Sequence, residues 1–405
     1  MTPVFILQIW LLGLFALGIL GAGAWLGHRW YQDAWAWDAA SQASVFAPDL
    51  GMNAPTGMLL GAILLILWSL GGRFVVTSFL KRGCRTPAPG EKDPRKRPTP
   101  QSTATANRLD GSSIHVEFFG PADGEVVVLT HGWTLSGRAW NHLIRDLPDN
   151  FRLVTWDEPG MGRTSQPVNR DFSLENMAQD LSSVLKLCGA KPVVLIGHSI
   201  GGMILLTFAK ARTAMLEHQV AGLVLSHTTP VNPVRTTSGA SFLSAIEKPV
   251  LMPLMYLTIF LSPLVRVLSW LSYLNGSSHL SALHSSFAGT QTWQDLDFAA
   301  TYPPLSAPAA QARGMLGMMR YSAESHLEQI DVPVLVVAGD LDGVTKPEAS
   351  DMIVSGVPKA RLHTLAPAKH LGLIEHHETY ASVIREFAHM AHGQYNKERE
   401  LAGKV

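Results

Sequence analysis

A short strand, a tight turn and a helix follow one another directly between Pro192 and Ala209, and this stretch constrains the fold most. Its first part, Val193–Ile196, is apolar and β-branched, which predicts a buried strand. Glycines at positions 197 and 201 flank the turn, because a strand that reverses sharply into a helix leaves no room for Cβ atoms there. Such a turn exposes the Ser199 hydroxyl above the sheet and leaves the Ile200 N–H available to a negative oxygen. The alternative is an ordinary glycine-containing turn with a capping serine.

Apolar strands alternate with helical patterns from about Arg108 onward. The expected strands are Ile114–Phe119, Val126–Thr130, Arg152–Trp156, Val193–Ile196, Gly222–Ser226, Val332–Ala338 and Arg361–Leu365. The expected helices are Arg138–Asp146, Leu174–Leu187, Ile200–Arg212, Pro347–Val354 and Tyr380–His392. This alternation predicts an α/β fold, in which a mostly parallel sheet carries helices on both faces and the site lies beyond the carboxyl ends of the strands.

Four of these strand ends carry groups suited to chemistry. The segments that follow the four strands are His131-Gly132-Trp133-Thr134, Asp157–Ser165, Gly339-Asp340-Leu341-Asp342-Gly343 and the loop that contains His370. A serine hydroxyl needs a base to take its proton, and a neutral imidazole suits that task near pH 7. A buried carboxylate must then hold the imidazole tautomer. The order Ser199, a carboxylate at 340 or 342, then His370 is typical of one fold, and the Trp133 N–H is the candidate second oxyanion donor.

Residues 108–393 resemble the α/β-hydrolases, the superfamily of esterases, lipases and related enzymes. The motifs that carry the resemblance are His131-Gly132-Trp133, Asp157-x-x-Gly160-x-Gly162, Gly197-His198-Ser199-Ile200-Gly201-Gly202, Gly339-Asp340-Leu341-Asp342 and His370. The resemblance implies that Asp342 is the triad acid and that Asp340 is structural. It also implies that a serine at position 199 disfavours epoxide opening and halide removal, which use an aspartate there. No cofactor is expected, and no metal site, since His376, His377 and His392 are scattered along a terminal helix.

Two apolar runs precede this domain and predict a transmembrane hairpin. The first, residues 4–26, carries no charge and is long enough to cross a bilayer. A secretory signal peptide is the competing interpretation, but no Lys or Arg precedes the run. The second, residues 57–80, is interrupted by Arg73, which must reach the interface or face protein. The tryptophans that follow the first run suit the headgroup level of a membrane.

The charges that flank the runs predict the orientation. Only Arg29 among the basic residues lies between the runs, whereas the linker beyond them, residues 82–107, is rich in Lys and Arg. By the positive-inside rule the basic side is cytoplasmic, so the catalytic domain is expected there. We interpret this Pro-rich linker as a flexible tether and residues 394–405 as a polar tail. Cys84 and Cys188 lie in such unlike places that no disulfide is expected.

A long insertion, about residues 228–323, separates two of the expected strands. The resemblance implies a helical lid, and its apolar core is Val250–Leu274. A third membrane span fails on topology, since one crossing would separate Ser199 from His370, and prolines at 253 and 263 break the run. We expect this lid to line an acyl pocket, and two alternatives stay open for its apolar surface: contact with the bilayer or burial within the enzyme alone. The expected substrate-binding residues are His131, Gly132, His198, Phe260 and Trp270.

These features together predict a membrane-anchored serine hydrolase that acts on an apolar ester or a lipid. The net charge of zero gives no sign of nucleic-acid binding. An acyltransferase that uses the same acyl-enzyme is the second hypothesis, and a non-catalytic binding protein on this fold is the third.

Overall fold

The computed structural model of the chain describes residues 4–48, 54–108, 110–147, 150–211, 216 and 218–402. Its centre is an eight-stranded sheet with the strand order β10-β9-β8-β7-β5-β6-β4-β3. The strands are β3 (Ser102–Asn107), β4 (Ser113–Phe119), β5 (Glu125–Thr130), β6 (Phe151–Trp156), β7 (Val193–His198), β8 (Val220–Ser226), β9 (Val334–Gly339) and β10 (Ala360–Leu365). All neighbouring strands from β10 to β6 run parallel, and β4 runs antiparallel to both β6 and β3. The predicted α/β-hydrolase architecture is confirmed.

Helices cover both faces of the sheet, as the buried character of its strands requires. In the described part of the hydrolase domain, the helices outside the lid include α4 (Asn141–Asp146), α5 (Leu174–Lys186), α6 (Ile200–Ala211), α14 (Pro347–Gly356), α15 (Gly372–Glu375) and α16 (His377–Ala402), with the 3₁₀ turns η2 (Gly137–Trp140) and η5 (Glu324–Gln329). One apolar core joins the sheet to α5 and α6, and a second joins the opposite face to α4 and α16. Helix α16 continues to Ala402, so most of the predicted polar tail is helical.

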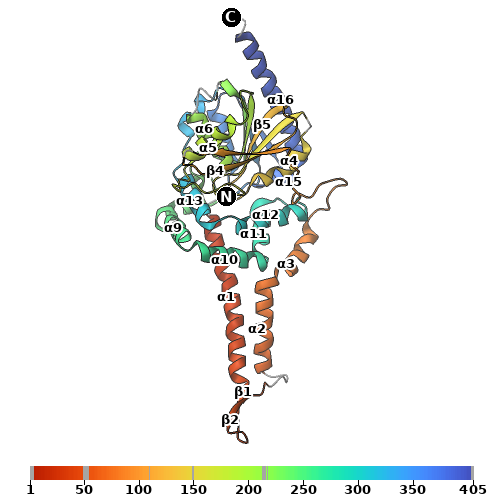
Figure 1. The fold of residues 1–405 in the computed structure, drawn as a ribbon, viewed down its shortest axis with the longest axis vertical. Coiled ribbons are helices and arrows are strands. Elements are labelled where there is room, and N and C mark those ends of the chain that lie inside the picture. Colours follow the sequence, from red (N-terminus) through yellow and green to blue (C-terminus); the bar gives the residue numbers. More distant parts are fainter. Residues whose placement is uncertain are drawn as a thin grey trace.

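The insertion between β8 and β9 is helical throughout its central part. It contains η3 (Pro233–Arg235), α8 (Ala240–Ile246), a π turn η4 (Glu247–Leu251), α9 (Met252–Phe260), α10 (Ser262–Leu274), α11 (Ser277–Ser286), α12 (Trp293–Leu305) and α13 (Pro308–Met319). These helices lie between the sheet and the N-terminal helices (Figure 1). They form the lid, which therefore sits over one end of the sheet.

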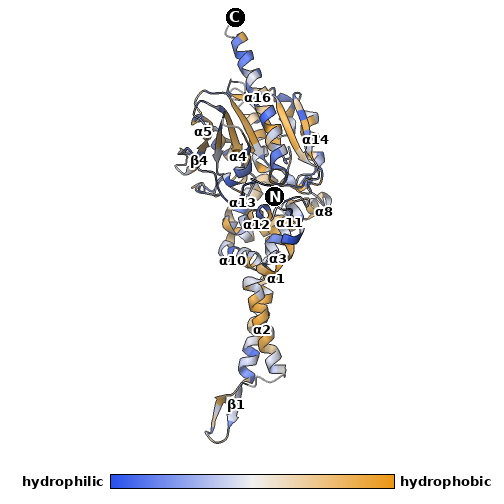
Figure 2. Ribbon diagram, turned by 90° about the vertical axis from the view of Figure 1, so that its right-hand side faces the viewer, coloured by the Kyte–Doolittle hydropathy of each residue, from blue (hydrophilic) through white to orange (hydrophobic). Residues whose placement is uncertain are grey.

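Two long helices extend from the lid side of the molecule (Figure 1). They are α1 (Val4–Asp33) and α2 (Ala54–Gly71), and a small hairpin of β1 (Trp35–Asp38) and β2 (Ala43–Phe46) follows α1. The two helices pack closely, since a Cβ on Gly23 would lie 3.0 Å from the Ile66 side chain. Figure 2 shows that their projecting parts are mostly hydrophobic, whereas α16 is largely hydrophilic.

The second predicted apolar run bends where the sequence suggested one continuous span. Helix α2 ends at Gly71, and α3 (Arg73–Leu80) continues at an angle of 62°. Arg73 lies at the bend, and its guanidinium sits 5.0 Å from the centre of the Tyr273 ring on α10. The charged group therefore faces protein, one of the two alternatives for a charge inside an apolar run.

Among the described residues, two helical stretches are long and apolar enough to cross a membrane, Phe5–Asp33 and Ala240–Phe260. The bent pair Pro55–Gly71 and Arg73–Gly83 would count as a third if it formed one span. The stretch Ala240–Phe260 belongs to the lid, where Leu251 and Met255 are buried in the domain core. The length and composition of this stretch therefore do not by themselves indicate that it crosses a membrane.

Residues 82–107, predicted as a flexible tether, contact the hydrolase domain at several points. The linker begins with a 3₁₀ turn, η1 (Lys81–Gly83), and its last residues form β3 at the edge of the sheet. Arg85 pairs with Glu91, Arg95 with Asp297 on α12, and Arg97 with Glu117 on β4. A strand at the edge of a sheet needs only backbone hydrogen bonds and a few buried side chains. The sequence of β3 is therefore polar and shows no apolar periodicity from which a strand could be predicted.

Candidate active site

Ser199 stands at the junction of β7 and α6, as the Gly-His-Ser-Ile-Gly turn predicts. Its backbone has φ of 56°, which is unusual for a residue with a side chain. A Cβ on Gly197 would lie 2.5 Å from the Gly201 carbonyl, and one on Gly201 would lie 2.4 Å from the Thr130 carbonyl oxygen. Only glycine fits at these two positions, and the close packing holds Ser199 in its strained conformation.

His370 and Asp342 meet Ser199 from two other strand ends. The Nε2 atom of His370 lies 3.1 Å from the Ser199 Oγ, and its Nδ1 atom lies 2.9 Å from the Asp342 Oδ2. The Asp342 carboxylate also accepts hydrogen bonds from the N–H groups of Val344 and Thr345, at 2.8 and 3.1 Å. His370 therefore bridges the other two residues that the sequence placed in one triad, Ser199 and Asp342.

The electrostatics of the site suit a neutral base beside an ionised acid. Burial opposes the ionisation of Asp342, but the charge of His370 and the hydrogen bond from His227 outweigh it and hold the pKa of Asp342 well below its usual range. Burial lowers the pKa of His370 to about 4, and Asp342 only partly offsets that effect. At neutral pH His370 is thus an uncharged imidazole that can accept a proton.

A second histidine, His227, shares the acid, and sequence reasoning missed it. Its Nδ1 atom lies 3.1 Å from the Asp342 Oδ2, the same oxygen that contacts His370. His227 follows β8 directly, with φ of 48°. Its position at a strand end beside the site was the available signal, since each predicted triad member occupies such an end.

The two aspartates of the Gly339-Asp-Leu-Asp segment differ in position. Asp342 is buried in the triad, whereas Asp340 is exposed. The Oδ1 atom of Asp340 accepts a hydrogen bond from the Ala368 N–H at 2.8 Å. Asp340 therefore holds the loop that presents His370 and does not contact the imidazole.

The two candidate oxyanion donors are the N–H groups of Ile200, which follows Ser199 in the chain, and of Trp133, which lines the same cavity as Ser199. As the first residue of α6, Ile200 has an N–H without an acceptor inside the helix. The Trp133 ring is buried, and its Nε1 donates to the Gln311 carbonyl at 3.0 Å, which fixes the loop after β5. A Cβ on the preceding Gly132 would lie 2.5 Å from the His198 ring, so this backbone can approach the site only as glycine.

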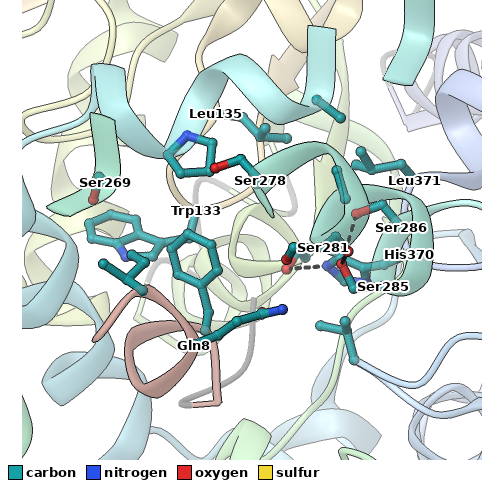
Figure 3. A pocket seen from close by; sticks show the side chains of 18 of the residues that line it. Gln8, Trp133, Leu135, Ser269, Ser278, Ser281, Ser285, Ser286, His370 and Leu371 are labelled. Carbon is teal, nitrogen blue, oxygen red and sulfur yellow. Dashed lines mark hydrogen bonds between the residues drawn. The ribbon is translucent and has the colours of Figure 1, made fainter. Parts of the chain in front are cut away.

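A cavity of about 100 Å³ opens beside the triad (Figure 3). It is lined by Gly132, Trp133, Leu135, His198, Ser199, Val344, His370 and Leu371 of the domain; Ser269, Ser272, Ser278, Ser281, Ala282, Ser285, Ser286, Ala299 and Pro303 of the lid; and Phe5, Gln8, Ile9 and Leu12 of α1. The lid thus contributes many hydroxyls and few large apolar groups. The α1 residues were not foreseen, because an apolar run of spanning length gives no sign that part of it packs in a soluble domain.

Three of the expected substrate-binding residues do not line this cavity. His131 is buried behind the loop, where its Nε2 accepts the Glu158 N–H at 3.0 Å. Phe260 and Trp270 lie on the outer surface of the lid, 82% and 39% exposed. Periodicity shows which lid residues are apolar but not which side of the lid faces the site, so the sequence could not show that Phe260 and Trp270 lie away from this cavity. Gly132 and His198 do line the cavity.

Two groups of histidines and carboxylates bring potential metal ligands within 4.8 Å of one another among the described residues. One is His227 with Asp342 and His370, whose hydrogen bonds are described above. The other is His142, Asp146 and His377, in which the His377 Nδ1 and the Asp146 Oδ2 lie 2.6 Å apart. Spacing along α16 could not reveal this second group, because its members come from two different helices. In both groups the histidines and carboxylates are hydrogen-bonded to one another, as in a polar network.

Comparisons with known proteins agree with this architecture. The model of the alpha/beta hydrolase family matches residues 127–383. The pimeloyl-[acyl-carrier protein] methyl ester esterase of Nitrosomonas europaea is 27% identical over 276 residues, which cover 67% of this chain and 98% of the esterase. A thermophilic esterase structure from Thermogutta terrifontis superposes with a TM-score of 0.56 at 22% identity, over 72% of this chain and 99% of that one.

Other relatives carry different activities in their names. The cis-3-alkyl-4-alkyloxetan-2-one decarboxylase of Xanthomonas campestris is 32% identical over 162 residues, 37% of this chain and 49% of the decarboxylase. The chain spans only about half the length of the first curated relatives that it matches. Relatives of this chain are therefore named for more than one reaction. Because the matched region covers more than half of its length, the chain belongs to the alpha/beta hydrolase family.

Proposed function

We propose that the chain is a membrane-anchored serine hydrolase that cleaves an apolar carboxylic ester through an acyl-enzyme. The observation that carries the proposal is the unbroken contact from Ser199 through His370 to Asp342 beside a cavity. A nucleophile, a base and an orienting acid within hydrogen-bond reach are the parts that acyl transfer requires. The similarity to an enzyme named as a methyl ester esterase supports this reaction class.

In the proposed mechanism the Ser199 Oγ attacks the ester carbonyl carbon while His370 Nε2 takes the hydroxyl proton. Asp342 keeps the imidazole in the tautomer that accepts this proton at Nε2, and it stabilises the imidazolium. The N–H groups of Trp133 and Ile200 bind the oxyanion of the tetrahedral intermediate. His370 then returns the proton to the leaving alcohol, and water enters by the same route to release the acid.

The membrane part of the proposal rests on α1 and α2 together with the charges that flank them. In α1, the stretch Phe5–Asp33 is long and apolar enough to cross a bilayer. Exposed apolar side chains cover α2 (Leu60, Ile63, Leu64, Leu67 and Leu70), and the basic segment that follows α3 lies on the hydrolase side. By the positive-inside rule the hydrolase domain faces the cytoplasm.

Steady-state hydrolysis of p-nitrophenyl esters by the full chain in detergent micelles tests the reaction class. The parent is expected to cleave these esters, and Ser199→Ala is expected to lose about a million-fold in kcat, as in comparable triads. Ser183→Ala, on α5 and remote from the cavity, serves as the control and should match the parent. Equal activity of Ser199→Ala and the parent would reject the proposal.

A further inference from the structure

Helix α1 is longer than a bilayer requires. Its 30 residues span about 45 Å, whereas the hydrocarbon core of a membrane is roughly 30 Å thick. The excess lies at the start of the helix, where Ile6, Ile9 and Trp10 are buried in the same apolar core as the sheet. The first turns of α1 are therefore part of the enzyme and not of the membrane anchor.

Two specific contacts fix this segment against the lid. The Trp10 Nε1 donates to the Thr258 Oγ1 on α9 at 2.8 Å. A Cβ on Gly13 would lie 2.4 Å from the Leu268 Cβ on α10, so the two helices touch at the glycine backbone. Small residues allow helices such close approach. The position of α1 over the site is thus set by a side-chain hydrogen bond and by tight packing.

One face of this segment looks into the cavity beside the triad. Phe5, Gln8, Ile9 and Leu12 follow the spacing of a single helical face, and all four line the cavity with Ser199 and His370. Figure 3 shows the Gln8 side chain extending from α1 into the cavity, toward the end that holds His370. Gln8 is half-buried, and its amide makes no hydrogen bond to another described residue, so it is available to a polar group in the cavity.

The far end of this face reaches the apolar exterior. Leu12 lines the cavity, while its neighbour Leu11 is 60% exposed and Phe15 is exposed one turn further along. The lid helices beside α1 also carry exposed apolar side chains, among them Leu264 and Val267 of α10. The wall that α1 contributes to the cavity therefore ends at Leu12, next to exposed apolar side chains of the same helix.

We infer that the first turns of α1 form the acyl-binding wall of the site and that the substrate is a long-chain ester drawn from the bilayer along this helix. In this arrangement Phe5, Ile9 and Leu12 contact the acyl chain, and the Gln8 amide binds a polar oxygen of the ester. The inference rests on the proposed serine chemistry and adds the substrate class and the route. It gives the membrane helix a role in substrate selection beyond anchoring.

Matched substitutions on opposite faces of α1 test the acyl wall. Leu12→Trp fills the cavity, whereas Leu11→Trp adds the same bulk on the exposed face and should leave hydrolysis at the parent level. For Leu12→Trp the ratio of kcat/KM for dodecanoate to that for acetate p-nitrophenyl ester should fall about tenfold, since small misfits in an apolar pocket discriminate by that order. An unchanged ratio in Leu12→Trp, or an equal fall in both variants, would overturn the acyl wall.

Gln8→Leu keeps the volume of the side chain and removes the amide. Loss of one hydrogen bond should lower kcat/KM for both esters by about fivefold. A rate equal to that of the parent would remove Gln8 from substrate binding.

A photoreactive probe maps the path of the chain directly. A long-chain alkyl fluorophosphonate with a terminal diazirine is reacted with the full-length protein in vesicles, irradiated and digested for mass spectrometry. We expect an adduct on Ser199 that is cross-linked to residues 5–15. An adduct on Ser199 with cross-links only elsewhere would overturn the inference and leave the serine chemistry intact. Absence of any adduct on Ser199 would reject the serine chemistry, and the inference with it.

Discussion

Ser199 has a strained backbone, its hydroxyl contacts His370, and His370 in turn contacts Asp342. The hydroxyl lies within 3.1 Å of a base whose other nitrogen lies 2.9 Å from a buried carboxylate. The identities of these residues were predictable, because each stands in a short motif at a strand end. His227 was not, because a lone histidine after a strand carries no motif, and its contact with Asp342 exists only in the folded chain.

Replacing the two aspartates separately tests their roles. Asp342→Asn should lower kcat about ten-thousand-fold, because the amide favours the wrong imidazole tautomer. Asp340→Asn keeps an oxygen that can accept the Ala368 N–H and should stay within a few-fold of the parent. Ester hydrolysis by both purified variants, with circular dichroism to confirm folding, gives the comparison. A dead Asp340→Asn beside an active Asp342→Asn would reverse the assignment.

The acid limb of the pH profile reports on His370. Catalysis needs the neutral imidazole, so activity is retained above the pKa of His370 and is lost as the pH falls through about 4. The limb of kcat/KM should therefore lie clearly below 6.5, the ordinary histidine value. A limb at or above 6.5 would contradict the buried, neutral state of His370.

Stability must be followed in the same experiment. Burial also lowers the pKa values of His131 and His198, so these groups stay neutral in the fold while the unfolded chain binds protons below about pH 6.5. The free energy of unfolding should accordingly decrease as the pH drops below that value. Measuring the folded fraction at each pH separates unfolding from titration of the base.

Element-scale comparison shows where sequence patterns are informative. The strands of the central sheet are apolar runs between turn residues, and their positions agree with the prediction to within a few residues. Strand β3 was missed because it is a polar edge strand. The sequence also did not show which side of the lid faces the site, because large apolar residues occur both in its buried core and on its exposed surface. The contact of the first turns of α1 with the lid could not be predicted either, because helical turns that span a membrane and turns that pack in a protein core are both apolar.

Deleting residues 1–100 tests whether α1 belongs to the enzyme. From the sequence alone, such a truncated chain should remain an intact hydrolase. The structure predicts instead that it is unstable, because each fully buried aliphatic side chain such as Ile6 contributes about 2 kcal/mol and the lid loses its contact with α1. Thermal unfolding of the truncated and full-length proteins in the same detergent measures the difference. An equal melting temperature with full activity would contradict this account of α1.

At the scale of the whole molecule, the hydrolase domain and the β1–β2 hairpin lie at opposite ends of the α1–α2 pair (Figure 1). If the pair spans the bilayer, the two ends face different compartments. Ser41, in the hairpin, and Ser325, in η5, are both exposed and offer labelling sites at each end.

Single cysteines at these positions test the orientation in a chain whose Cys84 and Cys188 are replaced by serine. With a membrane-impermeant maleimide added to intact cells, Ser41→Cys should be labelled and Ser325→Cys should be labelled only after lysis. The opposite pattern would place the hydrolase domain outside, and labelling of both before lysis would argue against a spanning hairpin.

In the proposed mechanism, Ser199 carries the acyl group during turnover. The most direct measurement mixes the full-length protein with excess p-nitrophenyl dodecanoate, quenches in acid within the first turnovers, and maps the peptides by mass spectrometry. The account predicts the mass of the dodecanoyl group on the peptide that contains Ser199, and no such adduct in Ser199→Ala. Continued turnover with an unmodified Ser199, or an acyl group on another residue, would contradict it.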